Sequence, residues 1–182
     1  MKKILLTSAG FENQNIQNKF MGLINKEPKD IKVLFITTAA IEPDAIMVLP
    51  KCLEDLLNCH ISMENITVYD MHKLIEIEEL KKYDAVYVCG GKTSYLADRM
   101  NEVGFKKVID EYINHGGIYI GVSAGSVAAS GKYKNGLNFI KNILDVHCAD
   151  GTPAGEIKTT DEIKLTDNQA ILVTDNNITI IE

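Results

Sequence analysis

The chain has 182 residues, of which 46% are hydrophobic and 24% charged, and its formal net charge is −6. This composition excludes intrinsic disorder, and the scattered basic residues, with Arg99 as the only arginine, exclude a nucleic-acid-binding surface. No apolar run approaches the roughly 20 residues that span a bilayer, and residues 1–10 lack the apolar stretch of a secretory signal. We therefore expect a cytoplasmic protein that binds neither nucleic acid nor membrane.

Strand and helix patterns alternate along most of the chain. In order, we expect a strand at 2–7, a helix at 13–25, a strand at 31–37, a helix at 43–58, a strand at 66–69, a helix at 73–80 and a strand at 85–89. Helices at 93–101 and 105–115, a strand at 118–122 and a helix at 124–129 follow. Strands that are apolar on both faces and separated by helices are typical of a parallel sheet covered on both sides.

The last third of the chain has a different pattern. Short strands are expected at 162–166, 169–174 and 178–181, and Asp/Asn pairs between them are typical of hairpin turns. The sequence thus predicts one α/β domain spanning residues 1–182. It is a three-layer sandwich with a mostly parallel sheet, helices on both faces and antiparallel hairpin strands at the C-terminal edge.

Four cysteines lie at positions 52, 59, 89 and 148. They form no CxxC pair, and no histidine stands at a metal-ligand spacing from them. We therefore expect free thiols and no metal site.

Gly121-Val122-Ser123-Ala124-Gly125 is a GxSxG pattern between an expected strand and an expected helix. In that context the pattern predicts a nucleophile elbow, in which Ser123 stands at the carboxyl edge of the sheet. The flanking glycines allow the strand and the helix to approach closely. The alternative interpretation is a plain strand-to-helix turn in which Ser123 only caps the helix.

An acyl-transfer site also needs backbone N–H groups that stabilise an oxyanion. Ala124 supplies one candidate at the start of its helix. The Gly90-Gly91 turn after the strand at 85–89 supplies the other, because glycine lets the backbone approach a ligand closely.

His147, 24 residues after Ser123 in an apolar, strand-like run, is the best candidate for the general base. The carboxylate that would orient its ring is less clear. Asp145 is the one acidic residue between Ser123 and His147, and on a regular strand the two side chains would share a face. Asp150 and Glu156 are alternatives, and a Ser123–His147 dyad without an acid is a further hypothesis.

The GVSAGS elbow, the CGG-x-T turn before it and the opening KKILLTSAG segment resemble the peptidase E, or aspartyl dipeptidase, family. More distantly, the chain is similar to cyanophycinases and to the class I glutamine amidotransferase-like fold. The resemblance implies Ser123 as nucleophile, His147 as base and the Gly91 and Ala124 amides as oxyanion hole. It also implies hydrolysis of short peptides with an N-terminal aspartate, without metal or cofactor.

No arginine follows His147, so the guanidinium fork that would bind a substrate aspartate is missing. We therefore expect a serine hydrolase that cleaves a dipeptide or small peptide amide with a weak preference for aspartate. The alternative hypothesis is a catalytically weak or inactive module on the same fold that binds a small molecule. The sequence leaves open whether the chain forms a homodimer.

Overall fold

The computed structural model describes residues 2–158 and 162–182, and its first two thirds follow the predicted alternation. The strands there are β1 (Lys3–Thr7), β2 (Val33–Ile36), β3 (Ile66–Tyr69), β4 (Ala85–Val88) and β5 (Ile118–Val122). The helices are α1 (Gln14–Ile24), α2 (Pro43–Asn58), α3 (Ile77–Leu80), α4 (Thr93–Glu102), α5 (Phe105–Asn114) and α6 (Ala124–Ala129).

Among the described residues, eight strands form one sheet in the order β3-β2-β4-β5-β1-β9-β10-β7. The first five are mutually parallel. The last three, β9 (Ala170–Thr174), β10 (Asn177–Ile181) and β7 (Gly155–Ile157), each run antiparallel to their neighbour. The predicted mostly parallel sheet and the hairpin of β9 and β10 are therefore confirmed.

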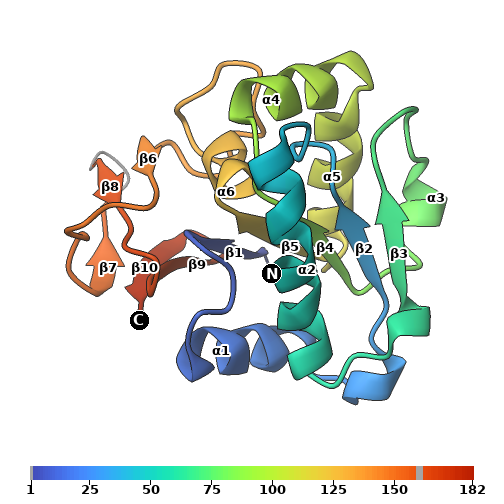
Figure 1. Cartoon of the computed structure of the whole chain (residues 1–182), viewed down its shortest axis with the longest axis horizontal. Helices are drawn as coiled ribbons and strands as arrows, with labels where there is room; N and C mark the ends of the chain where they lie inside the picture. Colours follow the sequence, from blue (N-terminus) through green and yellow to red (C-terminus); the bar gives the residue numbers. More distant parts are fainter. Residues whose placement is uncertain (1, 159–161) are drawn as a thin grey trace.

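The sheet buries both of its faces because successive residues of a strand point to opposite sides. On one face, Leu5, Phe35 and Tyr87 pack with α1 and α2. On the other face, alternate residues of the same strands pack with α3, α4, α5 and α6. Figure 1 shows α2 in front of the sheet and α1 below β1, and with helices packed on both faces the molecule has the expected three layers.

The C-terminal part differs from the prediction in two places. The strand expected at 162–166 is only β8 (Ile163–Lys164), and it pairs in parallel with β6 (Leu144–Asp145) in a separate small sheet. The outer edge of the main sheet is instead β7, which had no strand signal. The small sheet forms because Leu144 and Ile163 are fully buried in the core on one face of the large sheet, a tertiary contact that local residue patterns do not encode.

The sheet also assembles the loops in which the chemistry was expected. Because β1, β4 and β5 are parallel neighbours, their carboxyl ends meet at one edge. Ser8 follows β1, Gly90 lies just past β4 and Ser123 follows β5. Within residues 2–158 and 162–182, no helix is long and apolar enough to cross a bilayer.

Candidate active site

Ser123 occupies a sharp turn between β5 and α6, with φ 48° and ψ −108°. A non-glycine residue rarely adopts a positive φ, so this backbone is strained, as in a nucleophile elbow. The flanking glycines are sterically required. A Cβ on Gly121 would lie 2.7 Å from the Gly125 carbonyl carbon, and a Cβ on Gly125 would lie 2.3 Å from the Val88 oxygen.

Hydrogen bonds hold the elbow against β1. The Ser123 N–H donates to the Thr7 carbonyl over 3.1 Å, and the Thr7 hydroxyl donates to the Gly121 carbonyl, also over 3.1 Å. The Ser126 hydroxyl, fully buried in α6, lies 2.7 Å from the Thr7 oxygen and 2.8 Å from the Gly121 oxygen. The strained turn is thereby fixed by its surroundings.

His147 lies beside this serine, with Nε2 2.9 Å from Ser123 Oγ. Its other ring nitrogen, Nδ1, lies 2.6 Å from Oδ1 of Asp167. A carboxylate at Nδ1 favours the tautomer in which Nδ1–H donates to Asp167 and Nε2 accepts the serine proton. The three side chains have the connectivity of a nucleophile, a base and an orienting acid.

Asp167 is not the acid that the sequence pointed to. Asp145 pairs with Lys132 instead of His147. The expectation of a shared face fails because β6 ends at Asp145 and His147 has a positive φ of 57°, which breaks the alternation of a strand. The other two alternatives also make no hydrogen bond to His147 in the described part of the chain: Asp150 lies in an exposed loop and Glu156 on β7.

Ser8 is a second residue that the sequence reasoning missed. Its side chain is fully buried, accepts a hydrogen bond from the His147 N–H over 2.8 Å and donates one to Asp167 Oδ1 over 3.0 Å. It therefore fixes the backbone of His147 and the carboxylate of Asp167 together. The only local signal for Asp167 was the Asp167-Asn168 pair, which is equally typical of a turn.

The carboxyl group of Asp167 is held in its ionised form. Partial burial raises its pKa, but hydrogen bonds from His147 and Ser8, with the nearby charge of Lys51, lower the pKa below its usual value. Both His147 and Asp167 remain accessible, with side chains 49% and 56% exposed. Solvent therefore screens the pair more than it would a buried triad.

The Gly90-Gly91 turn lies next to the elbow. A Cβ on Gly90 would be 3.1 Å from the Ser123 Cβ. Gly91 has φ +136°, and a Cβ there would be 2.1 Å from the Ala39 oxygen, so only glycine fits. The structure gives the Gly91 and Ala124 N–H groups no hydrogen-bond acceptor among the described residues. Neither N–H group is therefore committed to another group of the described residues.

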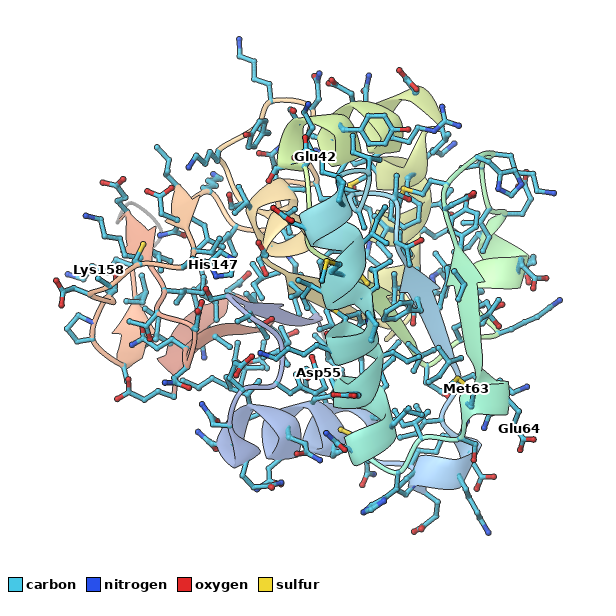
Figure 2. All side chains as sticks on the ribbon, in the orientation of Figure 1. Glu42, Asp55, Met63, Glu64, His147 and Lys158 are labelled. Carbon is cyan, nitrogen blue, oxygen red and sulfur yellow. The ribbon has the colours of Figure 1, made fainter. Side chains whose placement is uncertain are left out.

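A cavity of about 330 Å³ opens beside these groups. Its lining is Ser8, Ala9, Asp44, Ala45, Val48, Leu49, Lys51, Cys52, Gly90, Gly91, Val122, Ser123 and His147. Figure 2 shows His147 to the left of α2, the helix that contributes the residues from Asp44 to Cys52. Ser123, His147 and the glycine turn thus line one solvent-accessible cavity. Across residues 2–158 and 162–182, no group of three or more His, Cys, Asp or Glu side chains is placed to hold a metal.

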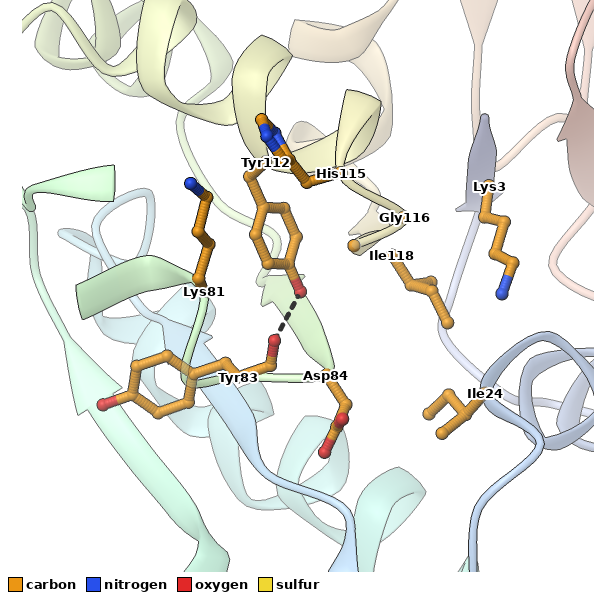
Figure 3. Close-up of a pocket in the computed structure, with 10 residues that line it drawn as sticks. Lys3, Ile24, Lys81, Tyr83, Asp84, Tyr112, His115, Gly116 and Ile118 are labelled. Atoms are coloured by element: carbon orange, nitrogen blue, oxygen red, sulfur yellow. Dashed lines mark hydrogen bonds between the residues drawn. The ribbon is translucent and has the colours of Figure 1, made fainter. Parts of the chain in front are cut away.

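A second cavity, of about 220 Å³, lies at the other end of the sheet (Figure 3). Lys3, Asp84 and Ile118 line it where β1, β4 and β5 begin, and Tyr112 donates a 3.1 Å hydrogen bond to the Tyr83 carbonyl at its side. Ligands of open α/β sheets bind at the carboxyl ends of the strands. We therefore assign the chemistry to the cavity beside Ser123.

Comparisons with known proteins relate the chain to peptidases. The model of peptidase family S51 matches residues 4–142. The uncharacterized peptidase Lmo0363 of Listeria monocytogenes is 44% identical over 52 residues, which are 29% of this chain and 25% of that protein. The uncharacterized peptidase PM1590 of Pasteurella multocida is 28% identical over 138 residues, 71% of this chain and 61% of that protein. The chain therefore spans less than two thirds of these relatives' length.

The fold is also known. A crystal structure of a candidate peptidase E protein from Listeria monocytogenes EGD-e superposes with a TM-score of 0.76 at 21% identity, covering 100% of this chain and 98% of that one. At this identity the likeness concerns the fold alone. The family match includes Ser123 and both glycine turns but ends before His147 and Asp167, whose placement rests on the geometry described above.

Proposed function

This chain belongs to peptidase family S51, and from that premise we propose that it hydrolyses an amide bond of a dipeptide or small peptide with Ser123 as nucleophile. His147 is the general base, Asp167 positions its ring, and the Gly91 and Ala124 amides stabilise the oxyanion. The observation that carries the proposal is the continuous chain of contacts from Ser123 Oγ through both His147 nitrogens to Asp167, 2.9 Å and 2.6 Å long.

In the first half-reaction, Ser123 Oγ attacks the substrate carbonyl carbon while its proton passes to His147 Nε2. The carbonyl oxygen becomes an oxyanion, which the two free N–H groups stabilise. His147, now protonated and held by Asp167, donates its proton to the leaving amine as the C–N bond breaks. An acyl-serine ester remains.

In the second half-reaction, His147 removes a proton from a water molecule, whose oxygen attacks the ester carbonyl. The resulting tetrahedral species collapses, the proton returns to Ser123 Oγ and the acid product leaves. The half-exposed position of His147 gives water direct access to this step. No metal or redox partner is needed to balance either half-reaction.

The competing hypothesis of an inactive binding module was motivated by the missing acid and the missing arginine. Asp167 in hydrogen-bond contact with His147 supports the hydrolase instead. The missing arginine bears on which peptide is cleaved and leaves the serine chemistry unaffected.

The decisive experiment compares the wild type with Ser123→Ala. We expect a fluorophosphonate probe to label Ser123 of the wild type and to leave the variant unlabelled. The kcat of the variant for peptide hydrolysis should be lower by about 10⁴–10⁶-fold. Its melting temperature should equal that of the wild type. The fold is unaffected because no hydrogen bond of the Ser123 side chain other than that to His147 is present in the described residues. Equal hydrolysis by the variant would refute the proposal.

A further inference from the structure

One wall of the active-site cavity is an apolar stripe on α2. Ala45, Val48, Leu49 and Cys52 recur at spacings of three and four, so they lie on one face of the helix, and all four line the cavity with Ser123. Val48 is 51% exposed, although it is a large apolar side chain. An apolar surface left open to water beside a reactive group is available for an apolar part of a ligand.

The charges around the cavity disfavour an anionic ligand. Among the described lining residues, Asp44 is the one carboxylate and Lys51 the one amine. The Lys51 ammonium already pairs with Glu12, and this hydrogen bond raises the pKa of Lys51. A substrate carboxylate in the cavity would share the Lys51 ammonium with Glu12, which already neutralises its charge, and would also meet the negative charge of Asp44 and Asp167.

The chain's single guanidinium is also committed elsewhere. Arg99 donates from Nε to the Met71 carbonyl over 2.9 Å, from Nη2 to the His72 carbonyl over 2.8 Å and from Nη1 to Glu102 over 2.8 Å. It does not line the cavity. The bidentate fork that recognises a carboxylate is therefore absent from the site.

From these contacts we infer that the cavity receives a neutral, apolar side chain, carried by the substrate residue whose carbonyl Ser123 attacks. This residue packs against Ala45, Val48 and Leu49. The inference rests on the proposed function and names its substrate class, namely short peptides with a leucine-like residue on the acyl side of the cleaved bond. A cavity of about 330 Å³ is at the small end of ligand sites, which suits a dipeptide.

The test measures kcat/KM for the dipeptides Leu-Leu, Asn-Leu and Asp-Leu. Asn and Leu have similar size and differ in polarity, whereas Asn and Asp differ in charge. We expect the kcat/KM of Leu-Leu to exceed that of Asn-Leu by about 10-fold or more, which is the discrimination that an apolar pocket supplies. The kcat/KM of Asn-Leu should in turn exceed that of Asp-Leu. An Asp-Leu value equal to or above that of Leu-Leu overturns the inference.

A matched pair of variants locates the pocket. Val48→Arg places a guanidinium in the cavity wall, whereas Met63→Arg adds the same charge at an apolar site, 55% exposed, that lies far from His147 in Figure 2. We expect Val48→Arg to lower the Leu-Leu to Asp-Leu ratio at least 10-fold and Met63→Arg to leave it within 2-fold. Both positions are exposed, so melting temperatures close to the wild type are expected. Equal ratios in the two variants overturn the inference.

Binding to Ser123→Ala separates this inference from the proposed function. Calorimetric binding of Leu-Leu at least 10-fold tighter than Asp-Leu supports the apolar pocket even if the wild type cleaves neither, in which case only the hydrolase proposal fails. Hydrolysis that prefers Asp-Leu supports the hydrolase and overturns the pocket. If no dipeptide of the panel is bound or cleaved, the inference is overturned.

Discussion

Asp167 is the member of the proposed triad that the sequence reasoning did not name. Its carboxylate sits at Nδ1 of His147 and is held there by Ser8. The acid of a serine triad fixes the tautomer of the imidazole and stabilises the imidazolium that forms during attack. Because Asp167 is 56% exposed, solvent also contributes to that stabilisation.

We expect Asp167→Asn to lower kcat by about 10²–10⁴-fold, with the lower end favoured by the exposure of the pair. Asp145→Asn is the matched control, since Asp145 pairs with Lys132 and should leave kcat within about 2-fold. Steady-state kinetics on one good dipeptide measure both. If kcat falls strongly in Asp145→Asn and is unchanged in Asp167→Asn, then Asp145 orients the His147 ring and our assignment of Asp167 is wrong.

Asp55 is a buried carboxylate on α2 outside the proposed mechanism, and Figure 2 shows it well below His147. Tyr87 donates a 2.6 Å hydrogen bond to Oδ2 and the Phe11 N–H a 3.0 Å bond to the same atom. Burial outweighs these two contacts and raises the pKa of Asp55 from 3.8 to about 6. The folded protein therefore binds this proton more tightly than the unfolded chain does.

A raised acid pKa stabilises the fold below the unfolded pKa, and that contribution is lost as the pH rises through the folded pKa. We expect the unfolding free energy of the wild type, relative to Asp55→Asn, to fall by on the order of 3 kcal/mol between pH 4 and pH 7. Urea unfolding of both proteins at several pH values measures it. A difference that is constant over this range would contradict the raised pKa.

At the scale of the element, α6 is notable for how closely it approaches the sheet. The Gly121–Gly125 pair lets the start of this helix, where Ala124 lies, touch the ends of β4 and β5. The same two glycines therefore set the position of α6 and, with it, of the Ala124 N–H group that the proposed mechanism uses.

Two Gly→Ala substitutions in helices should act in opposite directions. In Gly125→Ala the new Cβ would lie 2.3 Å from the Val88 oxygen, so α6 must move and we expect a loss of about 2–4 kcal/mol in unfolding free energy together with loss of activity. In Gly22→Ala the new Cβ meets no atom within 4 Å, and the better helix propensity should add about 0.5–1 kcal/mol. Denaturant titrations decide both. If Gly125→Ala leaves the unfolding free energy unchanged, the close approach of α6 to the end of β4 is not required.

At the scale of the whole molecule, β1 lies inside the sheet only because the C-terminal hairpin covers it. All five residues of β1 pair with β5 on one side and with β9 on the other. The ladder continues past the strand end, where the Ser8 N–H donates to the Gln169 carbonyl over 3.4 Å. The same ladder that completes the sheet therefore brings the loop with Asp167 to Ser8 and His147.

A chain truncated after residue 142 keeps the segment that the family model matches but loses β9, His147 and Asp167. We expect it to lack a cooperative thermal transition, because one side of β1 would be unpaired and its apolar face partly exposed. It should also be inactive. Circular dichroism during heating tests the first expectation, and a cooperative melt near the wild-type temperature would contradict it.

The elbow, the glycine turn and the parallel core were predictable because each is encoded locally. A strand, a sharp turn and a helix follow one another in the chain around Ser123, and their apolar spacing and glycines are visible without any partner segment. The hairpin of β9 and β10 was predictable for the same reason, since its turn residues lie between two apolar runs.

Tertiary structure alone decided three features: the contact of Asp167 with His147, the separate sheet of β6 and β8, and the position of β7 at the edge. Asp167 follows His147 by 20 residues, and its approach depends on the register between β1 and β9, which residue types near position 167 do not specify. The spacing of Asp145 and His147 along a strand made Asp145 the natural candidate. The positive φ of His147 breaks the strand alternation, so the two side chains do not share a face. The sequence by itself determined the fold class and the sharp turn at Ser123, because short-range sterics and burial set them. Which carboxylate meets His147 was decided by strand pairing between segments far apart in the chain.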